Sequence, residues 1–193
     1  RLIERNGTYG RMVAASGRGL VFVCQRNRQV IWRQSQDAGV SWSEARSLAR
    51  WDGGLLANPE LLALEEGVLL CFLNRRPEPQ SGHPYAIAVS RLEKGAAIWS
   101  EMSVIYTAGS AFGDGCWEPA AVRLPTGEIQ LFFANEGPYR ESDEQEISLM
   151  RSSDGGRTWG SVERVGFRAG HRDGMPVPVL LADGVAVAIE DNG

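Results

Sequence analysis

Residues Ser152–Trp159 of this chain read SSDGGRTW, and residues Ser35–Trp42 read SQDAGVSW. Both fit the pattern S-x-D-x-G-x-[ST]-W. In a tight turn the aspartate accepts backbone N–H bonds and the glycine takes a positive φ, while the tryptophan covers the hairpin with a large apolar surface. We therefore interpret Asp37 and Asp154 as turn builders rather than catalytic groups. Ser90–Trp99 is a degenerate third copy of the pattern, which has lost its aspartate and glycine.

A second landmark repeats in step with these turns. A proline stands eight residues before a glycine in PELLALEEG, PAAVRLPTG and PVPVLLADG, which start at residues 59, 119 and 176. The prolines are 60 and then 57 residues apart, and the tryptophans at 42, 99 and 159 are 57 and then 60 apart. Two independent landmarks with one period indicate stacked equivalent units.

Each unit consists of short runs rich in Val, Ile, Leu and Phe, bounded by Gly, Pro, Asp and Asn, as in hairpin-linked strands. No window sustains a helical i, i+3, i+4 pattern over three turns. Four short strands per unit predict an all-β fold, a β-propeller. We expect one propeller domain over residues 1–193, with blades at about 1–50, 51–108 and 109–166 and a partial blade at 167–193. Because propellers close with about 4–8 blades, we expect the remaining blades to come from a longer chain.

Composition excludes several function classes. The net charge is -4 and no block of basic residues occurs, so we expect no nucleic-acid partner. No apolar run reaches about 18 residues, so we expect no membrane partner either. The three cysteines lack metal-ligand spacing; Cys24 and Cys71 lie in apolar runs and are expected to be buried, and Cys116, in a glycine-rich loop, to be more exposed. We expect no metal and no cofactor.

Strand alternation sorts the connections onto two faces. If the strands of a unit alternate in direction, the Asp-containing turns share one face with the glycines of the proline–glycine repeat. The longer connections then share the other face, and functional residues concentrate on such loops. These connections span residues 51–58, 74–84, 109–118, 135–145 and 166–175.

Two glutamates stand out on that second face. Glu118 precedes a proline in GDGCWEPA, and Glu190 follows the apolar run VAVAI, where an acid is unusual unless a site requires it. Two carboxyl groups flanking a pocket are what glycoside hydrolysis needs. In the alternative interpretation, Glu118 caps a loop and Glu190 pairs with an arginine. Glu60 is a weaker third candidate, because it follows its proline.

Further polar and aromatic residues on the same face are candidates for sugar binding. Trp117 would stack on a sugar ring, and arginine, asparagine and aspartate side chains would hydrogen-bond hydroxyl groups. The predicted substrate-binding residues are Arg11, Asn58, Asn74, Arg75, Trp117, Asn135 and Asp173.

The turn pattern is that of the Asp box of sialidases and related propellers, and longer stretches resemble the exo-arabinanases (exo-1,5-α-L-arabinanases). The segments that carry this resemblance are WEPAAVRLPTGEIQLFFANE from residue 117, DEQEISLMRSSDGGRTW from residue 143 and DGMPVPVLLADG from residue 173. The resemblance implies a sialidase-like β-propeller, six-bladed in the full protein, of which about three and a half blades are present here.

In function, the resemblance implies a retaining glycoside hydrolase that acts on the non-reducing ends of α-1,5-linked arabinan or a similar plant polysaccharide. By analogy Glu118 would be the nucleophile and Glu190 the general acid/base. Retention implies carboxyl groups about 5–5.5 Å apart. The polysaccharide substrate implies an extracellular or periplasmic location.

Two other functions remain open from the sequence. A sialidase needs an arginine triad and a tyrosine nucleophile; Arg11 could belong to such a triad, although RMV stands where R-I-P is familiar. A non-catalytic Asp-box propeller that binds glycan or protein is the second alternative, because propellers host many functions.

Overall fold

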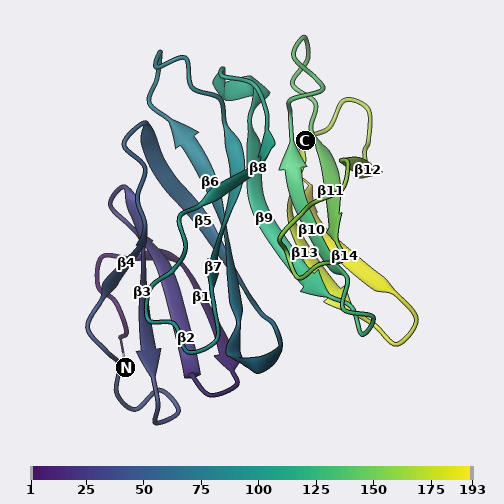
Figure 1. Ribbon diagram of the computed structural model, residues 1–193. Coiled ribbons are helices and arrows are strands. Elements are labelled where there is room, and N and C mark those ends of the chain that lie inside the picture. Colours follow the sequence, from purple (N-terminus) through teal and green to yellow (C-terminus); the bar gives the residue numbers. More distant parts are fainter. Residues whose placement is uncertain (1, 192–193) are drawn as a thin grey trace.

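The computed structural model describes residues 2–191 and contains four antiparallel sheets (Figure 1). Blade one holds β1 (Thr8–Ala15), β2 (Gly19–Arg26), β3 (Gln29–Ser35) and β4 (Arg46–Ala49). Blade two holds β5 (Gly54–Ala63), β6 (Leu69–Pro77), β7 (Ala86–Leu92) and β8 (Ser103–Thr107). Blade three holds β9 (Cys116–Arg123), β10 (Ile129–Asn135), β11 (Glu146–Ser152) and β12 (Glu163–Gly166), and the half blade holds β13 (Asp173–Leu180) and β14 (Val185–Asp191).

Within every sheet the strands follow one another in chain order. The first strand of each sheet contacts the first strand of the next, β1 with β5, β5 with β9 and β9 with β13. These four strands therefore form the inner side of the assembly, as in a β-propeller. Two short 3₁₀ turns, Glu65–Gly67 and Phe112–Asp114, lie in connections. The all-β propeller of three and a half blades predicted from the repeat is confirmed.

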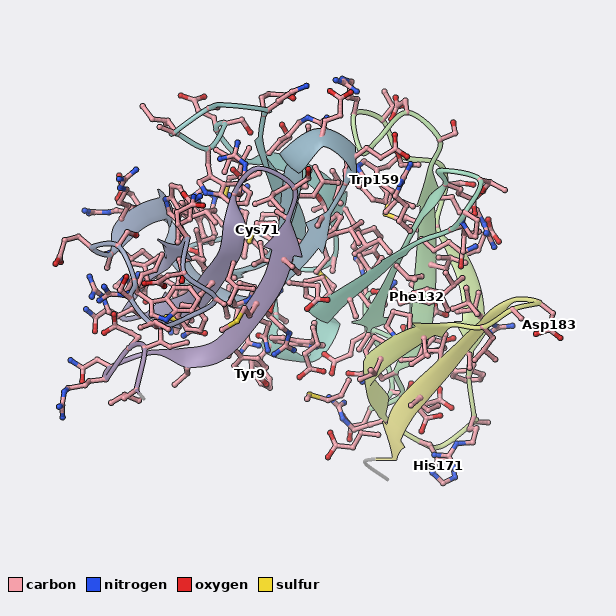
Figure 2. All side chains as sticks on the ribbon, turned by 90° about the horizontal axis from the view of Figure 1, so that it is seen from below. Tyr9, Cys71, Phe132, Trp159, His171 and Asp183 are labelled. Carbon is pink, nitrogen blue, oxygen red and sulfur yellow. The ribbon has the colours of Figure 1, made fainter. Side chains whose placement is uncertain are left out.

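Two apolar layers hold the blades together. Strand β6 contributes to both, because its side chains alternate between the two faces of its sheet. Leu69, Cys71 and Leu73 pack toward blade one, whereas Leu70 and Phe72 pack toward blade three. All five are fully buried. Figure 2 shows Cys71 and Phe132 inside the two layers and Asp183 at the tip of the β13–β14 hairpin.

All three cysteines are buried and unpaired. The prediction for Cys24 and Cys71 is confirmed, and burial raises the pKa of Cys24 to about 11. The expectation of a more exposed Cys116 is wrong, because this residue begins β9 and packs in the layer between blades two and three. Within residues 2–191 no helix is long and apolar enough to cross a membrane.

The Asp-box turns have the predicted structure. The Asp37 carboxylate accepts bonds from the Ser41 N–H at 2.8 Å and the Ser35 hydroxyl at 2.8 Å, and Gly39 has φ +90°. In the second turn, the Asp154 carboxylate accepts a bond from the Thr158 N–H at 2.9 Å. The interpretation of both aspartates as turn builders is therefore confirmed.

Glycine is required to different degrees at Gly155 and Gly156 in the second Asp box. Both have a positive φ, +73° at Gly155 and +86° at Gly156. A Cβ atom added to Gly155 would lie 3.6 Å from its nearest neighbour, whereas a Cβ atom added to Gly156 would lie only 2.5 Å from Leu70 Cδ1. We expect Gly155→Ala to lower the free energy of unfolding by about 1 kcal/mol, and Gly156→Ala by about 2–4 kcal/mol. Urea unfolding measures both, and equal losses would contradict the steric argument.

The first Asp box gives a pH-dependent prediction. Hydrogen bonds from Ser41, then from Ser35, lower the pKa of Asp37 from 3.8 to about 2. A lowered folded-state pKa contributes stability above pH 3.8 that is lost as the pH falls through 2. We therefore expect Asp37→Asn to be less stable than the wild type at pH 6, with a difference that shrinks toward pH 2. Urea unfolding at both pH values tests this. Asp52→Asn, at the exposed ion pair with Arg50, is the control and should change little.

Candidate active site

Each of the four inner strands is interrupted by a β-bulge at the same place. Two residues of the inner strand oppose one residue of the second strand, and the first of the two has a positive φ of 45–55°. Positive φ is uncommon outside glycine, and bulges turn a side chain away from the regular alternation. The residues at this position are Tyr9, Asn58, Glu118 and Met175.

The proline of the sequence repeat is the second residue of three of these bulges, and Gly10 takes its place in the first. Proline has no N–H to donate, so it is tolerated where the ladder is already broken. The proline that revealed the repeat in the sequence therefore also marks the bulge, where one side chain leaves the regular alternation of the strand. The four positions converge: the Tyr9 hydroxyl, from blade one, reaches Met175 Sδ of the half blade at 4.0 Å.

Glu118 and Glu190 are brought together at this convergence. The Met175 N–H donates to Glu118 Oε2 at 3.0 Å. Gly174, the neighbour of Met175, pairs with Glu190 across the β13–β14 ladder. Burial raises the pKa of Glu118, and the negative charges of Glu190 and Glu136 act in the same direction, against the Met175 N–H and the Arg76 guanidinium. The 5–5.5 Å separation stays a prediction.

A cavity of 270 Å³ opens beside Glu118. It lies on the face of the longer connections, where strand alternation predicted the site. Its wall combines aromatic rings with two arginines and two glutamates. The lining residues are Arg76, Phe112, Trp117, Glu118, Glu136, Gln145 and Arg172. A larger hollow of 620 Å³, between blade three and the half blade, is mostly apolar and contains none of the predicted site residues.

Arg76 occupies one wall of the cavity and is held on three sides. Its Nε donates to Asn74 Oδ1 at 2.7 Å, and its Nη2 donates to Asn58 Oδ1. Its guanidinium lies over the Trp117 ring, 5.0 Å from the ring centre. Trp117 is itself packed against Tyr85, at 4.9 Å between ring centres. Two of the predicted asparagines thus orient an arginine that the sequence reasoning missed.

The opposite wall contains a buried ion pair. Glu136, whose side chain is 1% exposed, binds Arg172 and accepts a bond from the Gly115 N–H at 3.3 Å. The Nη1 of Arg172 also donates to the Asp143 carbonyl at 2.9 Å. Glu136 follows the apolar run LFFA after one polar residue, Asn135, so a signal similar to the one that singled out Glu190 was present in the sequence.

The remaining predicted site residues have other partners. Arg11 forms an ion pair with Glu60 at 2.7 Å. Arg75 points to the face of β6 opposite to Arg76 and lies over Trp51, at 4.0 Å. Asn135 is buried and donates to the Ser148 hydroxyl at 3.0 Å, and Asp173 is buried and paired with Arg168. Of the seven predicted substrate-binding residues, Trp117 is the one that lines the cavity, and a role in binding stays a prediction for all of them.

Burial also raises the pKa of Glu60, against the opposing effect of Arg11. In the part of the chain that the structure describes, no group of three or more His, Cys, Asp or Glu side chains could hold a metal ion.

Residues 80–180, 101 of the 193 in the chain, match the BNR repeat-like domain family. This chain belongs to that family. A search of curated proteins finds no match. Among solved structures, the GH93 α-L-arabinofuranosidase of Fusarium graminearum, in complex with arabinobiose, is similar with a TM-score of 0.78 and 19% identity over 96% of this chain and 56% of that one.

Two further solved structures show the range of this likeness. The α-L-arabinanase of Penicillium chrysogenum, complexed with arabinobiose, has a TM-score of 0.73 and 18% identity over 96% of this chain and 57% of that one. The Hadza microbial sialidase Hz136 has a TM-score of 0.74 and 13% identity over 97% of this chain and 42% of that one. This BNR-repeat chain therefore has the sialidase-like propeller fold of known glycoside hydrolases and spans about half the length of these structures.

The Glu136–Arg172 pair gives a stability prediction. Arg172→Met leaves a carboxylate buried without its counter-charge, so we expect the free energy of unfolding to fall by about 3 kcal/mol. The double variant Glu136→Gln/Arg172→Met should recover part of this loss. Urea unfolding at pH 7 measures both. Arg151→Met, which breaks more exposed ion pairs, is the control and should cost about 0–1 kcal/mol. A loss no larger than that of the control would contradict the role of the buried pair.

Proposed function

We propose that this chain belongs to a retaining glycoside hydrolase that acts on the non-reducing ends of α-1,5-linked arabinan or a similar neutral plant polysaccharide. The observation that carries the proposal is the placement of Glu118. It is half-buried in the wall of a cavity, fixed by the Met175 N–H, and within electrostatic reach of Glu190 on the neighbouring sheet. Two carboxyl groups that flank the scissile bond are the requirement for glycosidic hydrolysis. Glu118 lines the cavity, and Glu190 lies on β14 of the next sheet.

In the proposed reaction, the Glu118 carboxylate attacks the anomeric carbon of the terminal sugar. The bond from that carbon to the leaving oxygen breaks, and this oxygen takes the proton of Glu190. Water then donates a proton to Glu190 and its hydroxyl group to the anomeric carbon, and the Glu118 carboxylate is released. The hydrogen bond from the Met175 N–H at 3.0 Å orients Glu118 for the first step.

The charges in the cavity favour a neutral sugar over a sialoside. Two arginines and two glutamates line it, so the formal charges balance. Arg172 is paired with Glu136, and Arg76 is engaged by two asparagine oxygens and the Trp117 ring. Neither guanidinium presents an open fork for the bidentate grip of a substrate carboxylate. The volume of 270 Å³ is at the small end of ligand pockets and suits the end unit of a glycan.

The solved arabinanase and arabinofuranosidase complexes with arabinobiose support the same substrate class at the level of the fold. An extracellular or periplasmic location follows from a polysaccharide substrate. The rival interpretations are a sialidase, with which the fold is shared, and a propeller that binds glycan without turnover.

Site variants test the proposal. We expect the protein, assayed within its full-length chain, to release sugar from linear arabinan and to leave sialyllactose intact. Glu118→Gln and Glu190→Gln should each reduce kcat by about 10²–10⁴-fold, because each removes an essential carboxyl group. Glu163→Gln, on the exposed outer strand β12, is the matched control. ¹H NMR of the first-formed product should show a retained anomeric configuration.

Three results would contradict the proposal. Turnover of sialyllactose in place of arabinan would favour the sialidase. Glycan binding without hydrolysis would favour the binding module. An inverted product would exclude the double-displacement mechanism.

A further inference from the structure

Arg76 is fixed at the junction of two blades by groups from three strands. Asn74 is on its own strand β6, Asn58 is at the bulge of β5, and Trp117 is on β9 of the next blade. Asn74 is anchored in turn, since its Nδ2 donates to the Cys116 carbonyl at 2.7 Å. A planar guanidinium bound at two nitrogens and one face has little freedom to move.

Asn58 is buried beside Arg76, and one of its two polar atoms is unpaired. It is 3% exposed, and its Oδ1 accepts the bond from Arg76, while its Nδ2 has no hydrogen-bond partner. Leaving a buried donor unpaired costs about 1–3 kcal/mol. Asn58 occupies the same bulge position in blade two that Glu118 occupies in blade three.

Arg76 lines the same cavity as Glu118, and its positive charge acts on the Glu118 carboxyl group. The charged groups that face Glu118 are Arg76 from β6, Glu190 from β14 and Glu136 beyond β10, together with the Met175 N–H from β13. Glu136 is neutralised by Arg172, and Arg76 by no carboxylate at salt-bridge distance among the described residues. The phenols of Tyr9 and Tyr85 lie near enough to Arg76 to act on it.

We propose that Arg76 is a positioning residue of this site: a fixed cation that keeps Glu118 a carboxylate facing the substrate. Asn58 orients Arg76 through the hydrogen bond that its Oδ1 accepts. This inference rests on the proposed function for its catalytic consequence, and its electrostatic part stands on the cavity that Arg76 and Glu118 line together.

The sign of the pH effect follows from the charge. Removing the cation makes the Glu118 carboxylate harder to ionise, so its pKa rises. A nucleophile must be ionised, so the acid limb of the kcat/KM profile moves to higher pH. If Glu118 were the general acid instead, the same change would move the alkaline limb.

The test compares Arg76→Met with Arg46→Met. Arg46 is on the outer strand β4 and lies over Trp32 at 5.5 Å, as Arg76 lies over Trp117 at 5.0 Å. We expect the acid limb of kcat/KM on arabino-oligosaccharides to move to higher pH in Arg76→Met. The loss at pH 5 should be about tenfold or more, and Arg46→Met should keep the wild-type profile. Arg76→Lys, which keeps the charge without the fork, should restore the acid limb but not the full kcat/KM.

The Asn58 part has its own readout. Asn58→Ala should move the acid limb in the direction of Arg76→Met, because it removes the oxygen that holds Arg76 Nη2. An unmoved acid limb in Asn58→Ala would overturn this part. Movement of the alkaline limb in Arg76→Met, or equal profiles for Arg76→Met and Arg46→Met, would overturn the role of Arg76.

A titration without turnover separates this inference from the proposed function. The ¹³C carboxyl signal of Glu118, assigned with Glu118→Gln in protein labelled at glutamate, is followed against pH. We expect its midpoint to move upward in Arg76→Met and to stay in Arg46→Met and Arg76→Lys. If the wild type hydrolyses no arabinan but the midpoint moves, the proposed function fails and the electrostatic role of Arg76 stands. An unmoved midpoint overturns that role whatever the activity.

Discussion

The hydrogen bond from the Met175 N–H to the Glu118 carboxylate joins two neighbouring sheets at the bulge of each. It is available because both residues have left the regular strand conformation, with φ of +49° and +55°. A regular ladder would have used the Met175 N–H within its own sheet and placed the Glu118 side chain by simple alternation. The site therefore depends on the interruption of the inner strands, which in blade three places the Glu118 side chain in the cavity wall.

Because every inner strand has this bulge, each blade can carry a different functional group at the same position without a change in the backbone fold. The bulge position holds a phenol in Tyr9, an amide in Asn58, a carboxylate in Glu118 and a thioether in Met175. The packing that supports them lies deeper, in the two apolar layers that share β6. A substitution of Glu118 thus changes what the cavity presents, whereas substitutions of the apolar residues of β6 change stability.

The formal charges in the cavity balance, in a fold that serves several reactions. The sialidase and the arabinan-degrading enzymes have similar backbones at 13–19% identity, so the backbone alone does not select a substrate. Here one arginine is neutralised by a buried glutamate and the other is held against an aromatic ring. Both arginines are thus engaged by side chains of the protein itself.

The sequence by itself determined the blade architecture, the Asp-box turns and the face that bears the site. Each of these follows from local hydrogen bonds, local backbone conformation and a repeated spacing. It also singled out Glu118 and Glu190, because an acid next to an apolar strand is visible in the pattern.

Only the tertiary structure decided between Arg75 and Arg76. Strand β6 is buried on both faces, so its apolar run has no polar alternation to indicate which arginine faces the cavity. Asn135 and Asp173 are of residue types that often bind sugars, but in the structure their side chains bind Ser148 and Arg168 within the protein. The Asn135–Ser148 pair depends on the strand register within blade three, and the Arg168–Asp173 pair on the connection that leads into β13. The position of Arg76 depends on which sheets lie side by side, because Trp117 belongs to the next blade, and no single repeat encodes that.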